Sequence, residues 1–131
     1  MRSKETSMLG DKDAVATVAV KDLGVARKFY ESKLGFKPLP STEPEVANYR
    51  SGRSTLLVYR SQYAGTNKAT AVTWTVDDTE AEVRALKAKG VAFEHYDIPG
   101  MTLKGDVHVM GEMKAAWLKD PDGNILAIVG R

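Results

Sequence analysis

Cysteine is absent from the 131 residues of this chain. Its absence excludes disulfide bonds, zinc sites with thiolate ligands and catalysis by a thiol nucleophile. Histidine occurs only twice, as His95 and His108, so any site that needs an imidazole must use one of these two side chains.

Long apolar runs and concentrated charge are also missing. No stretch approaches about 18 consecutive apolar residues, the length that a membrane-spanning helix requires. The 19 basic and 17 acidic residues are scattered, so no basic block indicates a nucleic-acid partner, and neither a membrane nor a nucleic acid is expected as a partner. The polar start lacks the apolar core of a signal peptide, and we expect residues 1–13 to be a flexible arm of a cytoplasmic protein. A true start at Met8 is equally consistent with the sequence.

What the chain does contain is enough apolar material for one compact domain. Hydrophobic residues make up 43% of it and charged residues 27%, as in ordinary globular proteins. Two stretches match in kind, AVATVAVKDLGVARKFYESKLGFKPL at 14–39 and TAVTWTVDDTEAEVRALKAKGVAFEH at 70–95. Each predicts a strand rich in Val and Thr, an amphipathic helix of roughly 11 residues, a glycine and a further strand.

Both predicted helices carry start and stop signals. Asp22 and Asp78 are placed to cap the first turns, because their carboxylates accept hydrogen bonds from exposed N–H groups there. Gly35 and Gly90 stand where the helices must end, since glycine adopts the left-handed conformation at little cost.

The helical periodicity also predicts which side chains are buried. On the first helix these are Ala26, Phe29, Tyr30 and Leu34, and on the second they are Ala81, Ala85, Leu86 and Ala88. The spacing of Thr79 and Glu82 further predicts a capping box at the start of the second helix.

Each half then continues into a hairpin. VANYRSGRSTLLVYR turns near Ser51-Gly52-Arg53, and KAAWLKDPDGNILAIVG turns at Asp120-Pro121 and Asp122-Gly123. We therefore expect two modules, about 14–62 and 69–131, which pack as one domain over 14–131 because either half alone would expose its sheet. The insertion YDIPGMTLKGDVHVMGEMK in the second half is consistent with a Met-rich lid, an ordinary long loop or a contact with a second chain.

The ordered set of motifs resembles the vicinal oxygen chelate superfamily, which includes glyoxalase I, extradiol dioxygenases, fosfomycin-resistance enzymes and bleomycin-resistance proteins. The motifs are the βαβββ unit used twice, the openings VKDL…A…FY…LGF and VDD…E…L…GV, and DPDGN before the last strand. The resemblance implies an α+β, glyoxalase-like fold in which two βαβββ modules form curved mixed sheets that enclose a cleft. Enzymatic members hold a divalent metal in that cleft, usually through His and Glu side chains.

The residues at the implied metal positions depart from the family pattern. The resemblance places these positions at Val15, Leu56, Ala71 and Ala127, with Leu57 as the alternative to Leu56. All of these side chains are apolar, whereas divalent metals need oxygen or imidazole nitrogen ligands. No metal ion and no other cofactor is therefore expected.

The same strands predict an apolar and aromatic cleft with a few hydroxyl groups. Because side chains alternate between the two faces of a strand, the candidate ligand-binding residues are Thr17, Tyr59, Thr73, Trp117 and His108. Threonine in a strand is equally consistent with β propensity, and tryptophan with packing in a core or an interface. No catalytic residue is identified.

Three functions are consistent with the sequence. We favour a metal-free protein that binds and sequesters a hydrophobic or aromatic compound, in the manner of the bleomycin-resistance proteins, whose resemblance also implies a homodimer. The second is a lyase or dioxygenase whose metal is held by relocated ligands drawn from Glu94, His95, His108 and Glu112. The third is a non-catalytic structural or regulatory dimer.

Overall fold

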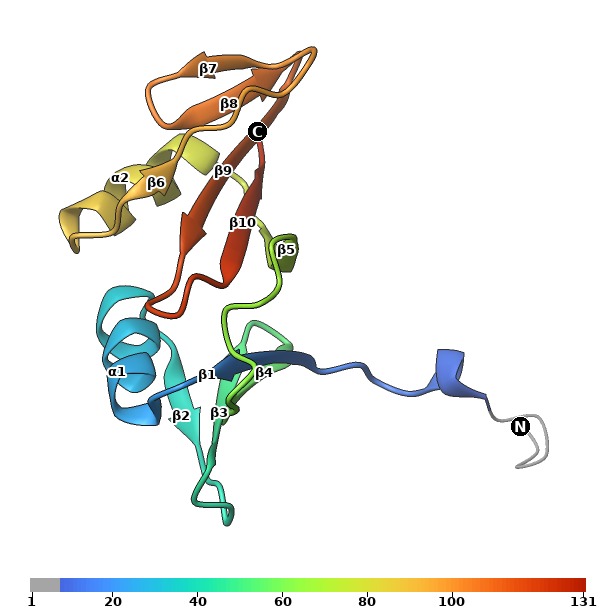
Figure 1. Ribbon diagram of the computed structural model, residues 1–131. Helices are drawn as coiled ribbons and strands as arrows, with labels where there is room; N and C mark the ends of the chain where they lie inside the picture. The colour runs from blue at the N-terminus through green and yellow to red at the C-terminus, as the bar shows by residue number, and fades with distance from the viewer. Residues whose placement is uncertain (1–7) are drawn as a thin grey trace.

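The computed structural model describes residues 8–131, which form two mixed β-sheets with one helical segment packed on each (Figure 1). The first module contains β1 (Ala16–Val20), α1 (Leu23–Arg27), the π-helical segment η3 (Lys28–Lys33), β2 (Lys37–Leu39), β3 (Val46–Ser51) and β4 (Ser54–Arg60). Its strand order is β1-β4-β3-β2, with β1 parallel to β4 and the other neighbours antiparallel.

The second module repeats this plan with an addition. It contains β5 (Thr70–Thr75), α2 (Thr79–Ala88), β6 (Phe93–Glu94), β7 (Thr102–Lys104), β8 (Val107–Met110), β9 (Met113–Lys119) and β10 (Ile125–Gly130). The order is β5-β10-β9-β8-β7, β5 is parallel to β10, and β6 also pairs with β9. The α+β fold with two βαβββ modules is confirmed, and part of the insertion forms the β7–β8 hairpin instead of a loop.

Local signals at the helix ends are confirmed in part. Asp22 accepts a hydrogen bond from the Val25 N–H at 3.1 Å, and Asp78 accepts one from the Ala81 N–H at 3.0 Å. The capping box predicted from Thr79 is wrong. Because Asp78 is the N-cap residue, Thr79 is already inside the helix, where it is fully buried and its hydroxyl donates to the Lys114 carbonyl.

The predicted buried face is correct for the first helix and half correct for the second, where Ala81 and Leu86 are half-buried. Ala26, Phe29 and Tyr30 are buried and Leu34 is half-buried. On α2, Ala85 and Ala88 are exposed, and the buried residues of the helix are Thr79 and Val83. The alanines misled the prediction because alanine is a strong helix former on exposed faces as well as on buried ones.

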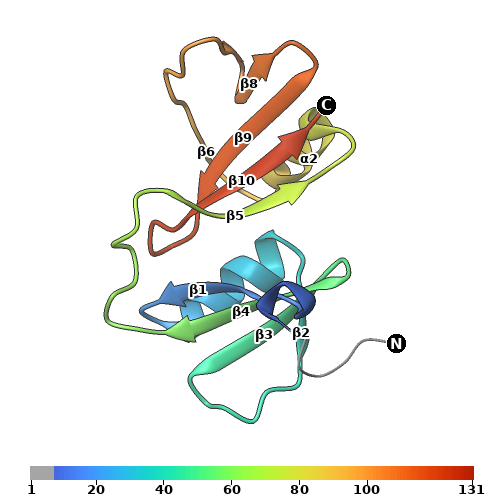
Figure 2. The same cartoon turned by 90° about the vertical axis from the view of Figure 1, so that its right-hand side faces the viewer.

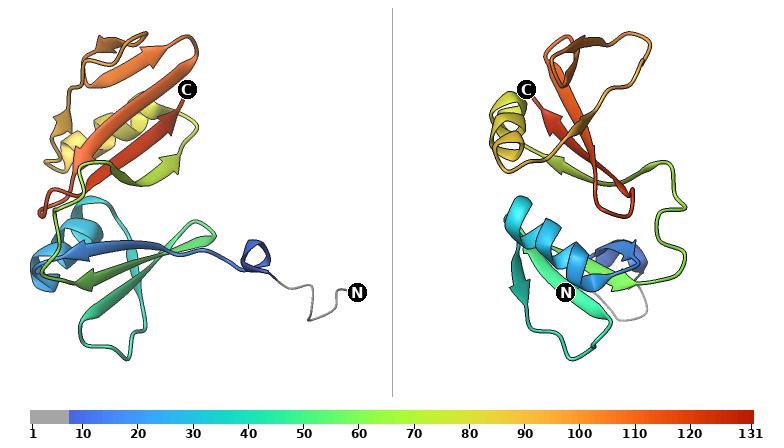
Figure 3. Two further views of the ribbon diagram at one scale, coloured as in Figure 1. Left: turned by 45° about the vertical axis from the view of Figure 1, so that its right-hand side comes forward. Right: turned by 60° about the vertical axis from the view of Figure 1, so that its left-hand side comes forward.

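One hydrophobic core joins the two modules on the side of the sheets that carries the helices (Figure 3). Its buried members include Val18, Val20, Phe29, Tyr30, Tyr49, Leu56, Val58, Leu118, Leu126 and Ile128. The modules meet along a seam where β1 and β5 face each other (Figure 2). Residues of both modules therefore contribute to one shared core.

At one end of the seam, the turn between β9 and β10 packs against the first module. Asp120 Oδ2 accepts a hydrogen bond from the Tyr30 hydroxyl at 2.8 Å, and Asn124 Nδ2 donates to the Ala19 carbonyl at 2.7 Å. Burial and the neighbouring Asp120 carboxylate raise the pKa of the Tyr30 hydroxyl well above its usual value.

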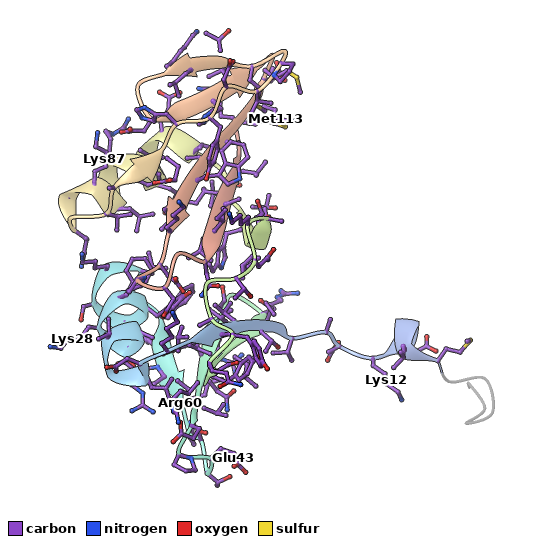
Figure 4. All side chains as sticks on the ribbon, viewed as in Figure 1. Lys12, Lys28, Glu43, Arg60, Lys87 and Met113 are labelled. Carbon is purple, nitrogen blue, oxygen red and sulfur yellow. The ribbon has the colours of Figure 1, made fainter. Side chains whose placement is uncertain are left out.

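The N-terminal segment makes no strand pairing with either sheet within residues 8–131. Residues 8–15 of the predicted arm, with the short 3-10 turn Leu9–Asp11, extend away from both modules, as the position of Lys12 shows (Figure 4). Residues 1–7 of that arm lie outside the described residues. None of the helices in 8–131 combines the length and the apolar character that a transmembrane segment requires.

Candidate functional site

The strand register places two of the predicted site residues on the face of the first sheet that points away from α1. Val18 and Val20 are buried in the core, so the intervening side chains of β1 point to the opposite face. Thr17 pairs with Leu57, and Tyr59 pairs with Ala19, which puts Thr17 and Tyr59 on that opposite face. Thr17 is exposed there and Tyr59 is half-buried.

The other three predicted residues share the corresponding face of the second sheet. Ala127 of β10 pairs with Thr73 on one side and with Trp117 on the other, so these three side chains stand in a row. His108 of β8 pairs with Ala115, two residues before Trp117 on the same strand. Thr73, Trp117 and His108 therefore lie on one face, opposite to α2.

The register also locates the positions where the family resemblance implies metal ligands. Thr17 and Thr73 are equivalent in the two halves, and they pair with Leu57 and Ala127 respectively. Leu57 is thus the counterpart of Ala127, whereas Leu56 is 1% exposed within the core. Val15, Leu57, Ala71 and Ala127 offer no oxygen or nitrogen side-chain atom, so these positions do not fit a divalent metal.

The relocated ligands of the second hypothesis do not form one group. His95 Nε2 lies 2.8 Å from Asp106 Oδ1, and Glu94 pairs with Lys119 at 3.3 Å. Within residues 8–131 no three His, Asp or Glu side chains gather in a way that could hold a metal ion.

Three aromatic side chains meet on the helix-free face of the second sheet. The rings of His108 and Trp117 lie edge to face with centroids 4.9 Å apart, and Tyr96 lies 5.5 Å from Trp117 and 6.1 Å from His108. The Trp117 indole N–H donates to the Thr70 hydroxyl at 3.3 Å. We call Tyr96, His108 and Trp117 the aromatic cluster.

The aromatic cluster contains two buried polar atoms without a partner among the described residues. His108 is 1% exposed, and its Nε2 accepts a hydrogen bond from the Tyr96 backbone N–H at 2.9 Å. This bond leaves the ring proton on Nδ1, which has no acceptor, and the Tyr96 hydroxyl has no partner either. Each unpaired group costs about 1–3 kcal/mol, so such groups point to a bound water or ligand.

The sequence did not identify Tyr96 as a member of this site. Tyr96 belongs to the irregular segment after β6, where no periodicity indicates the direction of a side chain. It reaches Trp117 because β6 pairs with β9, with Glu94 opposite Trp117, and because the β7–β8 hairpin places His108 beside the same strand. A short strand of two residues gives too little pattern to be predicted.

A second polar group, outside the aromatic cluster, anchors the β7–β8 hairpin. Asp106 lies in the hairpin turn and accepts hydrogen bonds from Lys87 of α2 at 2.6 Å and from His95 at 2.8 Å (Figure 4 labels Lys87). Both hydrogen bonds hold the pKa of the Asp106 carboxyl below its usual value, and the bond from Lys87 has the larger effect. His95 thus ties the hairpin to the body of the module.

Comparison with known proteins places this geometry in a wider group. Residues 13–128 match the family model described as the Glyoxalase/Bleomycin resistance protein/Dioxygenase superfamily. No curated protein gives a significant match to the sequence.

Solved structures share the fold at low sequence identity. A glyoxalase family protein from Enterococcus faecalis aligns with a TM-score of 0.69 and 19% identity, covering 93% of this chain and 99% of its own. The fosfomycin resistance protein FosX from Listeria monocytogenes aligns with a TM-score of 0.69 and 13% identity, covering 92% of this chain and 93% of its own. A lactoylglutathione lyase from Agrobacterium tumefaciens aligns with a TM-score of 0.66 and 16% identity, covering 92% of this chain and 93% of its own.

Proposed function

This chain belongs to the Glyoxalase/Bleomycin resistance protein/Dioxygenase superfamily, and from that premise we propose that it binds a small, partly apolar molecule at the aromatic cluster. The molecule is bound and sequestered rather than transformed, and no chelated metal takes part. The observation that carries this proposal is the pair of buried polar atoms without partners, His108 Nδ1 and the Tyr96 hydroxyl, between aromatic rings.

The chemistry of the aromatic cluster defines the kind of ligand. The His108 Nδ1–H is a hydrogen-bond donor, and the Tyr96 hydroxyl is able to donate as well. A planar molecule with a carbonyl or carboxylate oxygen would supply the missing acceptor and would place its ring against Trp117. Thr73 lies across β10 from Trp117, and its contact with the ligand is part of the proposal.

Thr17 and Tyr59 extend the proposal to the first sheet. They lie on the helix-free face of that sheet, in another module from the aromatic cluster. Their contact with a ligand, within one chain or between the chains of a dimer, stays a prediction.

The proposal is tested by replacing Trp117 and measuring ligand binding by calorimetry. Thermal-shift screening with aromatic acids, ketones and glycosylated aromatic compounds first identifies a ligand. Trp117→Ala should then weaken its binding at least about fivefold, because ring stacking contributes about 1 kcal/mol or more. Tyr63→Ala is the matched control, since Tyr63 is an exposed aromatic residue outside the aromatic cluster. A screen without any hit, or equal affinity of Trp117→Ala and the wild type, would contradict the proposal.

A measurement of metal content separates this proposal from the metalloenzyme alternative. Protein purified without a chelator should contain no stoichiometric Mn, Fe, Ni or Zn, because the four implied ligand positions carry no donor atoms. EDTA should leave both ligand binding and the melting temperature unchanged. One equivalent of any of these metals per chain would favour a lyase or dioxygenase over a binding protein.

A further inference from the structure

The structure contains a cleft away from the aromatic cluster, at the second end of the seam between the modules. Its volume is about 470 Å³, within the range of small-molecule sites. The cleft is lined by the β3–β4 turn, the segment between η3 and β2, the edge strand β5 and α2. Leu118 and Ile128 of the core are also in its wall. We call it the seam cleft.

The seam cleft exists because the two halves of the duplicated fold have turns of unequal length. At the other end of the seam, residues 120–124 between β9 and β10 fill the space against the first module through Tyr30 and Ala19. The corresponding turn between β3 and β4 consists only of Gly52 and Arg53. Ser51 beside it accepts a hydrogen bond from the Trp74 indole N–H at 2.8 Å, and the space beyond is open.

The walls of the seam cleft are apolar and partly aromatic. The rings of Phe36 and Trp74 lie 5.6 Å apart at an interplanar angle of 32°, and aliphatic side chains of Leu34, Leu86, Leu118 and Ile128 complete the wall. Such a surface suits a flat or compact apolar group, because burying it removes apolar area from water on both sides.

The seam cleft carries negative charge only. Glu82 of α2 is the single charged residue among those that line it, and no salt bridge to Glu82 is found within residues 8–131. The hydroxyl groups of Ser51 and Ser54 and of Thr73 and Thr75 add neutral polar groups. A carboxylate next to an aromatic wall favours a cation, since the negative face of an indole ring also attracts positive charge.

We propose that the seam cleft binds a small organic cation with an aromatic body. The aromatic body packs on the Phe36 and Trp74 wall, and the ammonium group lies near the Glu82 carboxylate. This site is distinct from the aromatic cluster, because Trp74 in its wall and Trp117 of the cluster point to opposite faces of the second sheet. Thr73 of the edge strand β5 borders the seam cleft as well as the row that contains Trp117.

The two tryptophans of the chain allow each site to be observed separately. Trp74 lines the seam cleft and Trp117 belongs to the aromatic cluster, so the two indole N–H signals in a ¹⁵N–¹H spectrum report on different sites. Trp74→Phe and Trp117→Phe assign the signals. The probe is 2-phenylethylammonium, and its neutral counterpart is 2-phenylethanol.

Titration of the wild-type protein with the cation at pH 7 should shift the Trp74 signal in a saturable manner and leave the Trp117 signal in place. Glu82→Gln should weaken binding of the cation about fivefold and leave binding of the alcohol unchanged, as expected for loss of one partly exposed ion pair. Ser54→Phe should abolish binding of both probes by filling the cleft. Glu43→Gln is the control for net charge, because Glu43 lies in the β2–β3 loop at the far end of the first module (Figure 4).

Three outcomes would overturn the proposal. They are an unmoved Trp74 signal at saturating cation, equal affinities of Glu82→Gln and Glu43→Gln for the cation, and equal affinities of the wild type for the cation and the alcohol. A shift of the Trp117 signal alone would assign the cation to the aromatic cluster. That result would overturn the proposed cation site in the seam cleft, but it would not contradict ligand binding at the aromatic cluster.

Discussion

At the residue scale, Asp120 connects the two modules. Its Oδ1 accepts the backbone N–H groups of Asp122 and Asn124, both at 2.9 Å, and its Oδ2 accepts the Tyr30 hydroxyl and Asn124 Nδ2, both at 2.8 Å. Asp120 is 5% exposed, so these bonds replace the water that a carboxylate otherwise requires. The DPDGN motif thus shapes its own turn and fastens that turn to the first helical segment.

The Tyr30–Asp120 contact predicts a loss of stability at high pH. Burial, with Asp120, raises the pKa of the Tyr30 hydroxyl, and burial, with a hydrogen bond to Glu31, raises the pKa of Tyr49. The unfolded chain releases these protons near pH 10, whereas the folded chain keeps them. The contribution of the two tyrosines to the free energy of unfolding is therefore fully present below about pH 10. Above that pH, the free energy of unfolding falls by about 1.4 kcal/mol per pH unit for each tyrosine.

Tyr30→Phe should reduce the fall in the free energy of unfolding above about pH 10 by the part that one tyrosine contributes. Urea unfolding between pH 9 and pH 11 measures the slope, and the variant should also lose about 1–3 kcal/mol at pH 7, because Asp120 loses a buried donor. Tyr63→Phe is the matched control, since Tyr63 is 69% exposed. Equal alkaline slopes in Tyr30→Phe and the wild type would refute the assignment.

At the scale of the element, helix starts are set by single side chains. Asp78 is extended at φ −134° and accepts the Ala81 N–H, while α2 presents Glu80 and Glu82 in its first turn, next to the positive end of the helix dipole. The neighbouring Asp77 is exposed and precedes the cap.

Asp78→Ala should lower the free energy of unfolding by about 1 kcal/mol, because the Ala81 N–H loses its acceptor. Asp78→Asn should restore most of this loss, since asparagine caps equally well. Thermal unfolding followed by circular dichroism measures both. Asp77→Ala removes the same charge one residue earlier, and a loss as large as that of Asp78→Ala would mean that charge, not capping, is responsible.

At the scale of the whole molecule, the helix-free faces of both sheets carry accessible side chains. Thr17, Thr73 and Thr75 are exposed there. These faces are consistent with the homodimer that the family resemblance implies, because exposed, half-apolar faces favour association.

We therefore predict that the protein forms a homodimer in solution. Sedimentation equilibrium should give twice the chain mass of 14.3 kDa at micromolar concentration. Leu57→Arg, which places a charge on the helix-free face of the first sheet, should shift the protein toward the monomer, whereas Arg53→Lys in the β3–β4 turn should not. A monomeric wild type at all concentrations would remove the dimer from the proposal.

The sequence by itself determined the features that depend on neighbours along the chain. The duplication, the caps at Asp22 and Asp78, the glycines that end the helices and both hairpin turns were all predicted, because turn and cap preferences act over a few residues. The family resemblance added the fold, and the apolar residues at the implied metal positions were visible directly in the sequence.

Only the tertiary structure decided the features that depend on pairing between distant strands. The register showed that Leu57, not Leu56, shares the face of Thr17, and it brought Tyr96, His108 and Trp117 together from three separate segments. The seam cleft likewise results from the difference between two turns that lie far apart in the sequence. A shift of one residue in register turns every side chain to the opposite face, and no local pattern fixes that choice.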